Sequence, residues 1–263
     1  MPPHVAEFTL HLVPLPALTD NYIWLLHDDD GNALVVDPGD AAVVESALAS
    51  RRLSLRAILL THHHDDHVGG AGELSRRHAA KVYAPADARI QVAHREVVDG
   101  ESIRLERPLA HFQVWAVPGH TLSHVAYVGE GLLFCGDTLF SMGCGRLFEG
   151  SPAQMLASLD RLSGLPAQTQ VCAGHEYTAS NGRFASTIEP DNPHLRQRVA
   201  AVAELRAEKR ATLPVALAVE LATNPFLRTD AEAVVQWCSR QGGAIEDRTA
   251  RFAMLRHAKD VFL

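Results

Sequence analysis

The segment THHHDDHVGG, residues 61–70, places four histidines and two aspartates at six successive positions directly after the apolar run LRAILL. So many ionisable groups cannot enter a core without partners. Side chains two residues apart point to the same side of an extended chain, so His62 and His64 converge. A turn after residue 65, which Gly69 and Gly70 would support, lets Asp66 and His67 face a second point. Imidazole and carboxylate groups suit zinc, iron or manganese, so the segment predicts metal binding.

Three further apolar runs end in a metal-ligand residue beside glycine. VPGHT offers His120, FCGDT offers Asp137 and CAGHE offers His175. A lone histidine after a strand is usually structural, but three such ends together with the first segment are hard to attribute to chance. One tetrahedral zinc ion takes at most four ligands. Seven candidates therefore predict two metal ions that share one aspartate. The seven are His62, His64, Asp66, His67, His120, Asp137 and His175.

Composition limits the other classes of function. The 263 residues are 47% hydrophobic and 21% charged, as in an ordinary globular protein, and the net charge of −7 argues against nucleic-acid binding, which needs a basic face. No apolar run is long enough for a membrane span, and the N-terminal residues carry no signal-peptide pattern. The four cysteines form no CxxC pair and are typical of a reducing compartment. We therefore expect a cytoplasmic protein without a membrane or nucleic-acid partner.

The pattern of predicted secondary structure changes near residue 175. Before it, short strand-like runs alternate with turns and a few helices, which predicts an α/β arrangement of sheets with helices outside. After it, long helical stretches prevail. We expect a metal-binding catalytic domain at 1–175 and a helical substrate-binding domain at 176–263. Expected strands, after a hairpin within 22–40, are 55–61, 81–85, 112–119, 124–129, 131–137 and 169–175; expected helices are 41–52, 73–78, 151–165, 193–210 and 230–241.

The motifs THHHDDHVGG, VPGHT, GDTLF and GHEYT together resemble the metallo-β-lactamase superfamily. The chain is most similar to its glyoxalase II members, the hydroxyacylglutathione hydrolases, and the resemblance covers nearly the whole length. LTDNYIWLL and VVDPGD match that family's N-terminal hairpin, and GCGRLFEG, NPFLR and RHAKD match its later markers. The resemblance implies an αββα metallo-β-lactamase sandwich followed by a small all-helical C-terminal domain.

The resemblance also implies how the ligands divide. His62, His64 and His120 would hold one ion, and Asp66, His67 and His175 the other, with Asp137 bridging. His63 and Asp65 fall at positions that are not ligands, and the remaining histidines, His124 among them, are expected to be structural. Two ions lower the pKa of a shared water towards neutrality and hold a hydroxide, which Asp66 could orient by a hydrogen bond. Zinc is the expected metal, and iron and manganese remain open.

For the family, the implied reaction is hydrolysis of S-(2-hydroxyacyl)glutathione thioesters, chiefly S-D-lactoylglutathione to D-lactate and glutathione, which detoxifies methylglyoxal. A thioester suits such a centre because its thiolate leaves readily. Glutathione carries two carboxylates, so its site needs cations. Arg256 and Lys259, neighbours on one helix face, match the pair that binds its glycine end. Arg146 stands where some members have lysine, and Phe148 where some have tyrosine. Tyr177 could donate a hydrogen bond to the glutathione backbone, and Asn181 is a weaker candidate.

Other interpretations stay open at this point. A glutathione persulfide dioxygenase would use the same fold with a single iron and fewer ligands, and would not be expected to carry the C-terminal Arg-x-x-Lys pair. A non-catalytic metal protein would have no substrate pocket, and a lactam hydrolase would usually be exported with a signal peptide. Asp37, in the VDPG turn, either supports a ligand histidine or simply forms the turn. The chain is expected to act as a monomer on its small-molecule substrate.

Overall fold

The structure, a computed structural model, describes residues 9–242 and 246–262, and it divides into two compact units, 1–114 and 115–263. Each unit is described by itself. The division at 114/115 differs from the change of pattern near residue 175, and the domain boundary at 175 stays a prediction. In the part of the chain that the structure describes, no helix is long and apolar enough to cross a bilayer.

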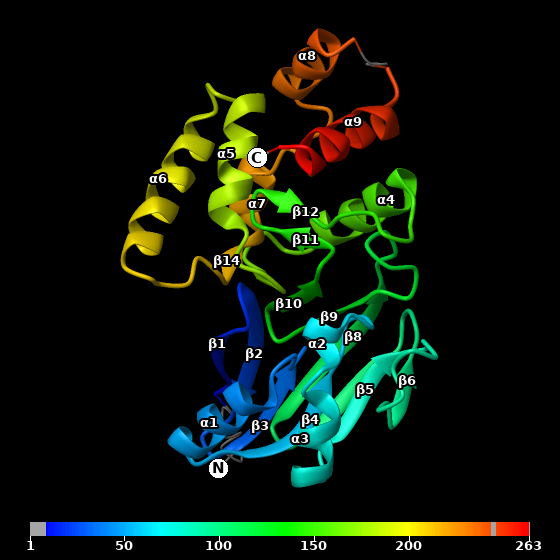
Figure 1. Cartoon of the computed structure of the whole chain (residues 1–263), viewed down its shortest axis with the longest axis vertical. Helices are drawn as coiled ribbons and strands as arrows, with labels where there is room; N and C mark the ends of the chain where they lie inside the picture. The colour runs from blue at the N-terminus through cyan, green and yellow to red at the C-terminus, as the bar shows by residue number, and fades with distance from the viewer. Residues whose placement is uncertain (1–8, 243–245, 263) are drawn as a thin grey trace, which may run out of the picture. The chain divides into compact units, whose positions relative to one another are not determined.

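The first unit is built on a six-stranded mixed sheet, in blue and cyan in Figure 1. The hairpins at its start are antiparallel, and the strands from β3 onwards pair in parallel. Helices connect β3 to β4 and β4 to β5. A separate antiparallel pair, β7 with β8, follows. In sheet order the strands are β1 (His11–Ala17), β2 (Asn21–His27), β3 (Asn32–Val36), β4 (Ser54–Leu59), β5 (Lys81–Pro85) and β6 (Arg95–Val97); the pair is β7 (Ser102–Glu106) and β8 (Leu109–Ala116).

One face of this sheet is covered by helices. Alternate strand residues such as Ile23, Val35 and Ile58 share one core cluster with Val44 of α1 and Leu74 of α3. Asp40 caps α1 by accepting a hydrogen bond from the Ala42 amide at 2.8 Å, so the helix begins directly after the Pro38-Gly39 turn. The helices are α1 (Ala41–Arg51), the one-turn α2 (Asp65–Val68) and α3 (Ala71–His78).

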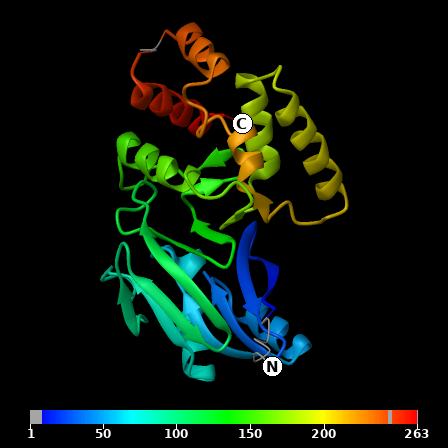
Figure 2. The same cartoon turned by 180° about the vertical axis from the view of Figure 1, so that it is seen from behind.

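The second unit joins a small sheet to a group of helices. The sheet order in this unit is β14-β13-β10-β9, and β10 and β13 are parallel. Helices α5 and α6 lie side by side in both views, with α8 beside α9 (Figures 1 and 2). The elements are β9 (Val125–Gly129), β10 (Leu132–Gly136), β11 (Leu139–Phe140), β12 (Gly143–Cys144), α4 (Pro152–Ser163), β13 (Gln170–Ala173), α5 (Thr178–Ile188), α6 (Pro193–Ala207), β14 (Val215–Ala216), α7 (Leu217–Thr223), α8 (Glu232–Arg240) and α9 (Arg248–Asp260).

Candidate metal centre and substrate wall

The expected turn inside the histidine segment is present. Strand β4 ends at Leu59, and α2 begins at Asp65, with His64 as its N-cap residue. His62 and His64 precede the helix, and His62 Nε2 lies 2.9 Å from His64 Nδ1. Asp66 and His67 lie on the helix, where His67 Nε2 is 3.4 Å from Asp66 Oδ2. The ligand atoms of His62 and His67 lie within 4.8 Å of one another.

Asp37 supports two of these histidines. Its Oδ2 accepts hydrogen bonds from His67 Nδ1 at 3.0 Å and from the Thr61 hydroxyl at 2.7 Å. The Thr61 hydroxyl in turn accepts a hydrogen bond from His62 Nδ1, at 3.0 Å. Both imidazoles are thereby held as the tautomer that is protonated on Nδ1, which leaves the Nε2 lone pair for a metal. Of the two interpretations of Asp37, the structure favours support of ligand histidines.

The second unit carries its own cluster. His120 Nε2 lies 3.4 Å from Asp137 Oδ2, and His175 Nε2 lies 3.3 Å from the same oxygen. Asp137 and His175 follow the parallel strands β10 and β13, whose carboxyl ends meet at one edge. All three side chains are almost fully buried. The arrangement brings together the three isolated strand-end residues that the sequence singled out.

The separations fit metal ligands. Two donors that bind one tetrahedral ion at about 2.0–2.1 Å lie roughly 3.3 Å apart. The Asp137–His120, Asp137–His175 and Asp66–His67 distances are all 3.3–3.4 Å. Neutral imidazole nitrogen and carboxylate oxygen are also the donor types that divalent zinc, iron and manganese accept. Each cluster therefore has the donor set and the spacing for divalent metal ions.

His124 supports Asp137, a role that the sequence did not predict. It is fully buried, and its Nε2 accepts a hydrogen bond from the Asp137 amide at 3.2 Å. His120 is oriented in a similar way, because its Nδ1 donates to the Arg146 carbonyl oxygen at 2.9 Å. The only sequence signal for His124 is its place just before the β9 strand, four residues after His120.

Aromatic side chains flank the second cluster. The Tyr177 ring stacks on His175 with 4.7 Å between ring centroids and 4° between planes. The Phe148 ring meets His120 edge-on at 5.2 Å and is 63% exposed. Tyr177 is at the N-cap of α5 and is 36% exposed. These rings leave apolar surface open beside the two histidines.

Cations gather in the same unit. Arg256 is buried and donates to the Cys144 carbonyl oxygen at 2.6 Å, while Lys259 donates to the Ser180 hydroxyl at 3.1 Å. Both lie on α9, one turn apart. Burial and the positive charges of Arg256, Arg183 and Arg146 lower the pKa of Lys259, and Asp260 offsets this only in part. An anionic ligand would relieve this repulsion.

Asn181, a weaker candidate from the sequence, and Arg183, which the sequence did not single out, both lie on α5. Asn181 is buried, and its amide donates to the Ser141 carbonyl oxygen at 3.1 Å, so it holds the chain rather than presenting a free amide. Arg183, two residues further along α5, is exposed and acts electrostatically on Lys259. Arg183 was not predicted, because nothing in the local sequence marks it.

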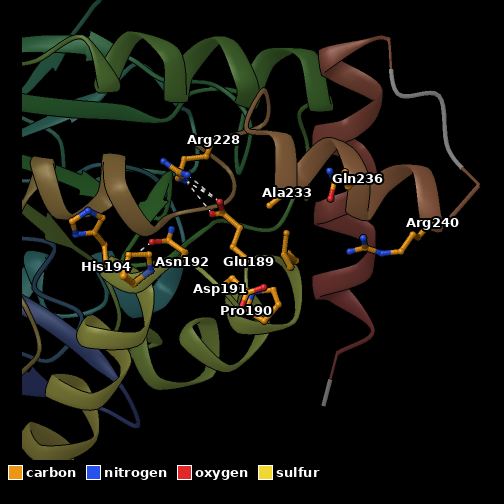
Figure 3. A pocket seen from close by; sticks show the side chains of 11 residues that line it. Glu189, Pro190, Asp191, Asn192, His194, Arg228, Ala233, Gln236 and Arg240 are labelled. Carbon is orange, nitrogen blue, oxygen red and sulfur yellow. Dashed lines mark hydrogen bonds and ion pairs between the residues drawn. The ribbon is translucent and has the colours of Figure 1, made fainter.

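A separate hollow of about 530 Å³ lies between the α5–α6 connection and α8 (Figure 3). Figure 3 shows the Arg228 guanidinium against the Glu189 carboxylate, and their ion pair has an N–O distance of 3.0 Å. Asn192 caps α6 and donates to the Ala222 carbonyl oxygen. Among the described residues that line the hollow, none is a predicted site residue. Its polar groups stabilise the helices around it.

Comparison with known proteins now decides the family. Residues 18–175 match the model described as "Metallo-beta-lactamase superfamily", and residues 176–262 match "Hydroxyacylglutathione hydrolase C-terminus". A protein of Cupriavidus metallidurans named hydroxyacylglutathione hydrolase is 49% identical over 265 residues, covering 96% of this chain and 99% of that protein. The chain belongs to the hydroxyacylglutathione hydrolase family. The resemblance seen in the sequence is confirmed.

Solved structures agree on the fold of this hydroxyacylglutathione hydrolase family member. The BLEG-1 B3 metallo-beta-lactamase superposes with a TM-score of 0.62 at 25% identity, over 83% of this chain and 99% of that one. TTHA1623, solved in a di-iron-bound form, gives 0.60 at 27% identity, over 82% and 100%. The expected fold class, a metallo-beta-lactamase fold followed by a helical C-terminal domain, is confirmed.

Proposed function

We propose that this chain hydrolyses S-(2-hydroxyacyl)glutathione thioesters, chiefly S-D-lactoylglutathione to D-lactate and glutathione, and thereby takes part in methylglyoxal detoxification. One observation carries the proposal. Within residues 115–263, one short stretch of chain connects a histidine–aspartate cluster to a cation cluster. Asp137 of the first cluster and Arg146 of the second are nine positions apart, and the Cys144 carbonyl oxygen between them accepts a hydrogen bond from Arg256. A hydrolytic centre and an anion-binding wall are thus built into one unit.

We propose that the two clusters act together on two divalent ions. His62, His64 and His120 would hold one ion, Asp66, His67 and His175 the other, and Asp137 both. Support comes from the donor distances within each cluster and from the family model, whose match spans all seven residues. Zinc is the metal we favour. Iron and manganese are alternatives, because the same ligand types accept them and because TTHA1623 was solved in a di-iron-bound form.

When bound, the ions would supply a water of lowered pKa and a Lewis acid for the thioester carbonyl. The side chains have the remaining tasks. The Asp66 carboxylate is half-exposed and can accept a hydrogen bond from a bound water. Asp37, Thr61 and the Arg146 carbonyl hold imidazole tautomers, so that the donor atoms need no reorganisation.

Residues 176–263 would bind the glutathione part. Arg256 and Lys259 would pair with a carboxylate, Arg146 would add a second cation, and the Tyr177 hydroxyl would donate to the peptide backbone. Phe148 offers only an apolar edge, so it would contact the substrate without a hydrogen bond. The buried, free cysteines support a reducing, cytoplasmic location, and we propose a monomer.

The test is turnover of S-D-lactoylglutathione, followed by release of free thiol, in the wild type and in Arg256→Ala. We expect hydrolysis by the wild type and a KM raised about tenfold or more in the variant, because loss of a charged hydrogen bond costs about 1.5–3 kcal/mol. Arg240→Ala, at the separate hollow, is the matched control and should leave KM unchanged. Oxygen consumption with glutathione persulfide, without thioester cleavage, would overturn the proposal.

A further inference from the structure

The stretch Leu139–Arg146, called here the linking segment, contacts both clusters of the second unit through its backbone. The Arg146 carbonyl oxygen accepts the hydrogen bond from His120 Nδ1 at 2.9 Å. The Cys144 carbonyl oxygen accepts the one from Arg256 Nη1 at 2.6 Å. One short piece of backbone therefore orients an imidazole of the metal cluster and a guanidinium of the cation cluster. A shift of the segment would disturb both.

The linking segment has little regular structure of its own. Its strands β11 and β12 are two residues each. Between them Met142 adopts a left-handed conformation, with φ of 55°, that disfavours residues with a Cβ atom. Such a conformation persists only where the surroundings hold it. The partners of the segment in neighbouring helices are therefore what fixes its path.

Glu220 of α7 is the central partner. Its side chain is fully buried, and Oε1 accepts the Ser141 hydroxyl proton at 2.6 Å while Oε2 accepts the Met142 amide at 2.7 Å. The second bond is made at the left-handed residue itself. Burial raises the pKa of Glu220, and the nearby charge of Arg198 lowers it. A carboxylate kept in the interior for these bonds costs desolvation, so its partners matter.

Asn224 completes the attachment. This fully buried residue begins the NPFLR motif, and its Nδ2 lies 3.0 Å from the Phe140 carbonyl oxygen and 2.9 Å from that of Gly143. The same nitrogen lies 3.2 Å from Glu220 Oε2, so the two side chains act as one group. Within the motif, Phe226 also lies under the Arg256 guanidinium, 5.3 Å from its ring centroid.

We propose that Glu220, together with Asn224, is a positioning residue: it locks the linking segment so that the backbone keeps His120 and Arg256 in their working orientations. That these orientations serve catalysis and substrate binding rests on the proposed hydrolysis. The contacts assign a task to Gly143 in GCGRLFEG and to Asn224 in NPFLR, which the catalytic scheme leaves without one. The segment is the physical link between the two clusters.

The experiment compares Glu220→Ala and Asn224→Ala with the conservative Glu220→Gln in the full chain. Glu189→Ala is the matched control, because Glu189 is also a buried glutamate, 4% exposed, and pairs with Arg228. Three quantities are measured: the thermal midpoint, the dissociation constant for Zn²⁺ by chelator competition, and the dissociation constant for glutathione by calorimetry. Turnover of S-D-lactoylglutathione by the wild type is recorded separately.

In both alanine variants we expect Zn²⁺ and glutathione binding to weaken about tenfold or more, as for other groups that orient ligands. Glu220→Gln should restore both, because its amide can accept the Met142 proton and donate to Ser141. Glu189→Ala should lower the thermal midpoint alone. If Glu220→Ala does not fold, the Zn²⁺ and glutathione dissociation constants of Asn224→Ala and of the milder variant Ser141→Ala test the positioning role instead.

Equal losses of thermal midpoint in the Glu220, Asn224 and Glu189 variants, with both dissociation constants unchanged, would overturn the positioning role. Failure of the wild type to cleave the thioester would instead remove the proposed function. In that case, Zn²⁺ affinity still reports whether the segment is held by Glu220, so the two failures are distinguishable.

Discussion

The Asp37 carboxylate supports two candidate ligand histidines of the first unit. It holds His67 directly and His62 through the Thr61 hydroxyl, and it does so from a left-handed backbone position, with φ of 53°. The sequence could suggest this residue but could not choose between support and turn formation. The contact joins residues 30 positions apart, and no local pattern encodes such a pairing.

Asp37→Asn tests this arrangement without changing the shape of the side chain. Asparagine tolerates the left-handed backbone, but either orientation of its amide sets the NH₂ against a donor. That donor is the Thr61 amide in one orientation and the Thr61 hydroxyl with His67 Nδ1 in the other. We expect metal affinity to fall about 10–100-fold, measured by chelator competition. Asp40→Asn, in the same turn, keeps the cap of α1 and should bind metal like the wild type. Unchanged affinity in Asp37→Asn would refute the role.

Lys259 predicts a pH dependence. Because its pKa is lowered from 10.5, chiefly by burial and also by neighbouring arginines, the side chain loses its charge at a lower pH than an ordinary lysine does. As pH rises through that value, the cation that would hold the substrate carboxylate disappears. We therefore expect kcat/KM to fall on the alkaline side with a midpoint below 10.5.

Lys259→Arg keeps a positive charge throughout this range, since arginine does not deprotonate in proteins. The alkaline fall in kcat/KM should move to higher pH or vanish in this variant. Lys209→Arg, on the exposed surface after α6, is the control and should show the wild-type profile. A profile identical in all three proteins would show that another group causes the fall.

Among the elements, the parallel strands β10 and β13 explain why a sequence reading could find Asp137 and His175. Each residue follows an apolar run and stands beside glycine, and parallel strands end at one edge. Several strands and helices were predicted within a few residues; the expected helix 41–52, for example, is α1, Ala41–Arg51. Strand β1 and helix α5 were not among the expected elements. Helix α7 was not predicted, because it has only seven residues and no capping side chain, which is too short for a helical periodicity to be recognised.

The linking segment depends on a close approach that only glycine permits. A Cβ atom on Gly145 would lie 1.9 Å from the Asp137 carbonyl oxygen. Gly145→Ala should therefore push the segment away and destabilise the fold by about 1–3 kcal/mol or more, seen as a lower thermal midpoint with weaker metal binding. Gly164→Ala is the control, because its nearest neighbour would be 3.4 Å away. Equal behaviour of the two variants would contradict this interpretation.

At the scale of the whole molecule, the chain carries ligand clusters in both compact units, and the match to the superfamily model spans both. The fold could be predicted from the motifs. The sequence also singled out His120, Asp137 and His175, which the structure brings together because each follows an apolar strand. That all seven candidates bind metal stays a proposal. The residues that orient them could not be predicted, because Glu220 and Ser141 are 79 positions apart in the chain. No change of composition marks the division at 115. The assignment of helices 176–263 to glutathione binding stays a proposal.

The most direct measurement of the central claim is a metal titration of the protein after a chelator has removed its metal. The titration is done without oxygen, and turnover of S-D-lactoylglutathione is the readout. Two ions held by seven ligands predict that activity rises until two equivalents of Zn²⁺ per chain have been added and then stays level, and that Asp137→Ala fails to reach this plateau. Full activity at one equivalent, or cleavage that needs iron and oxygen, would contradict the account.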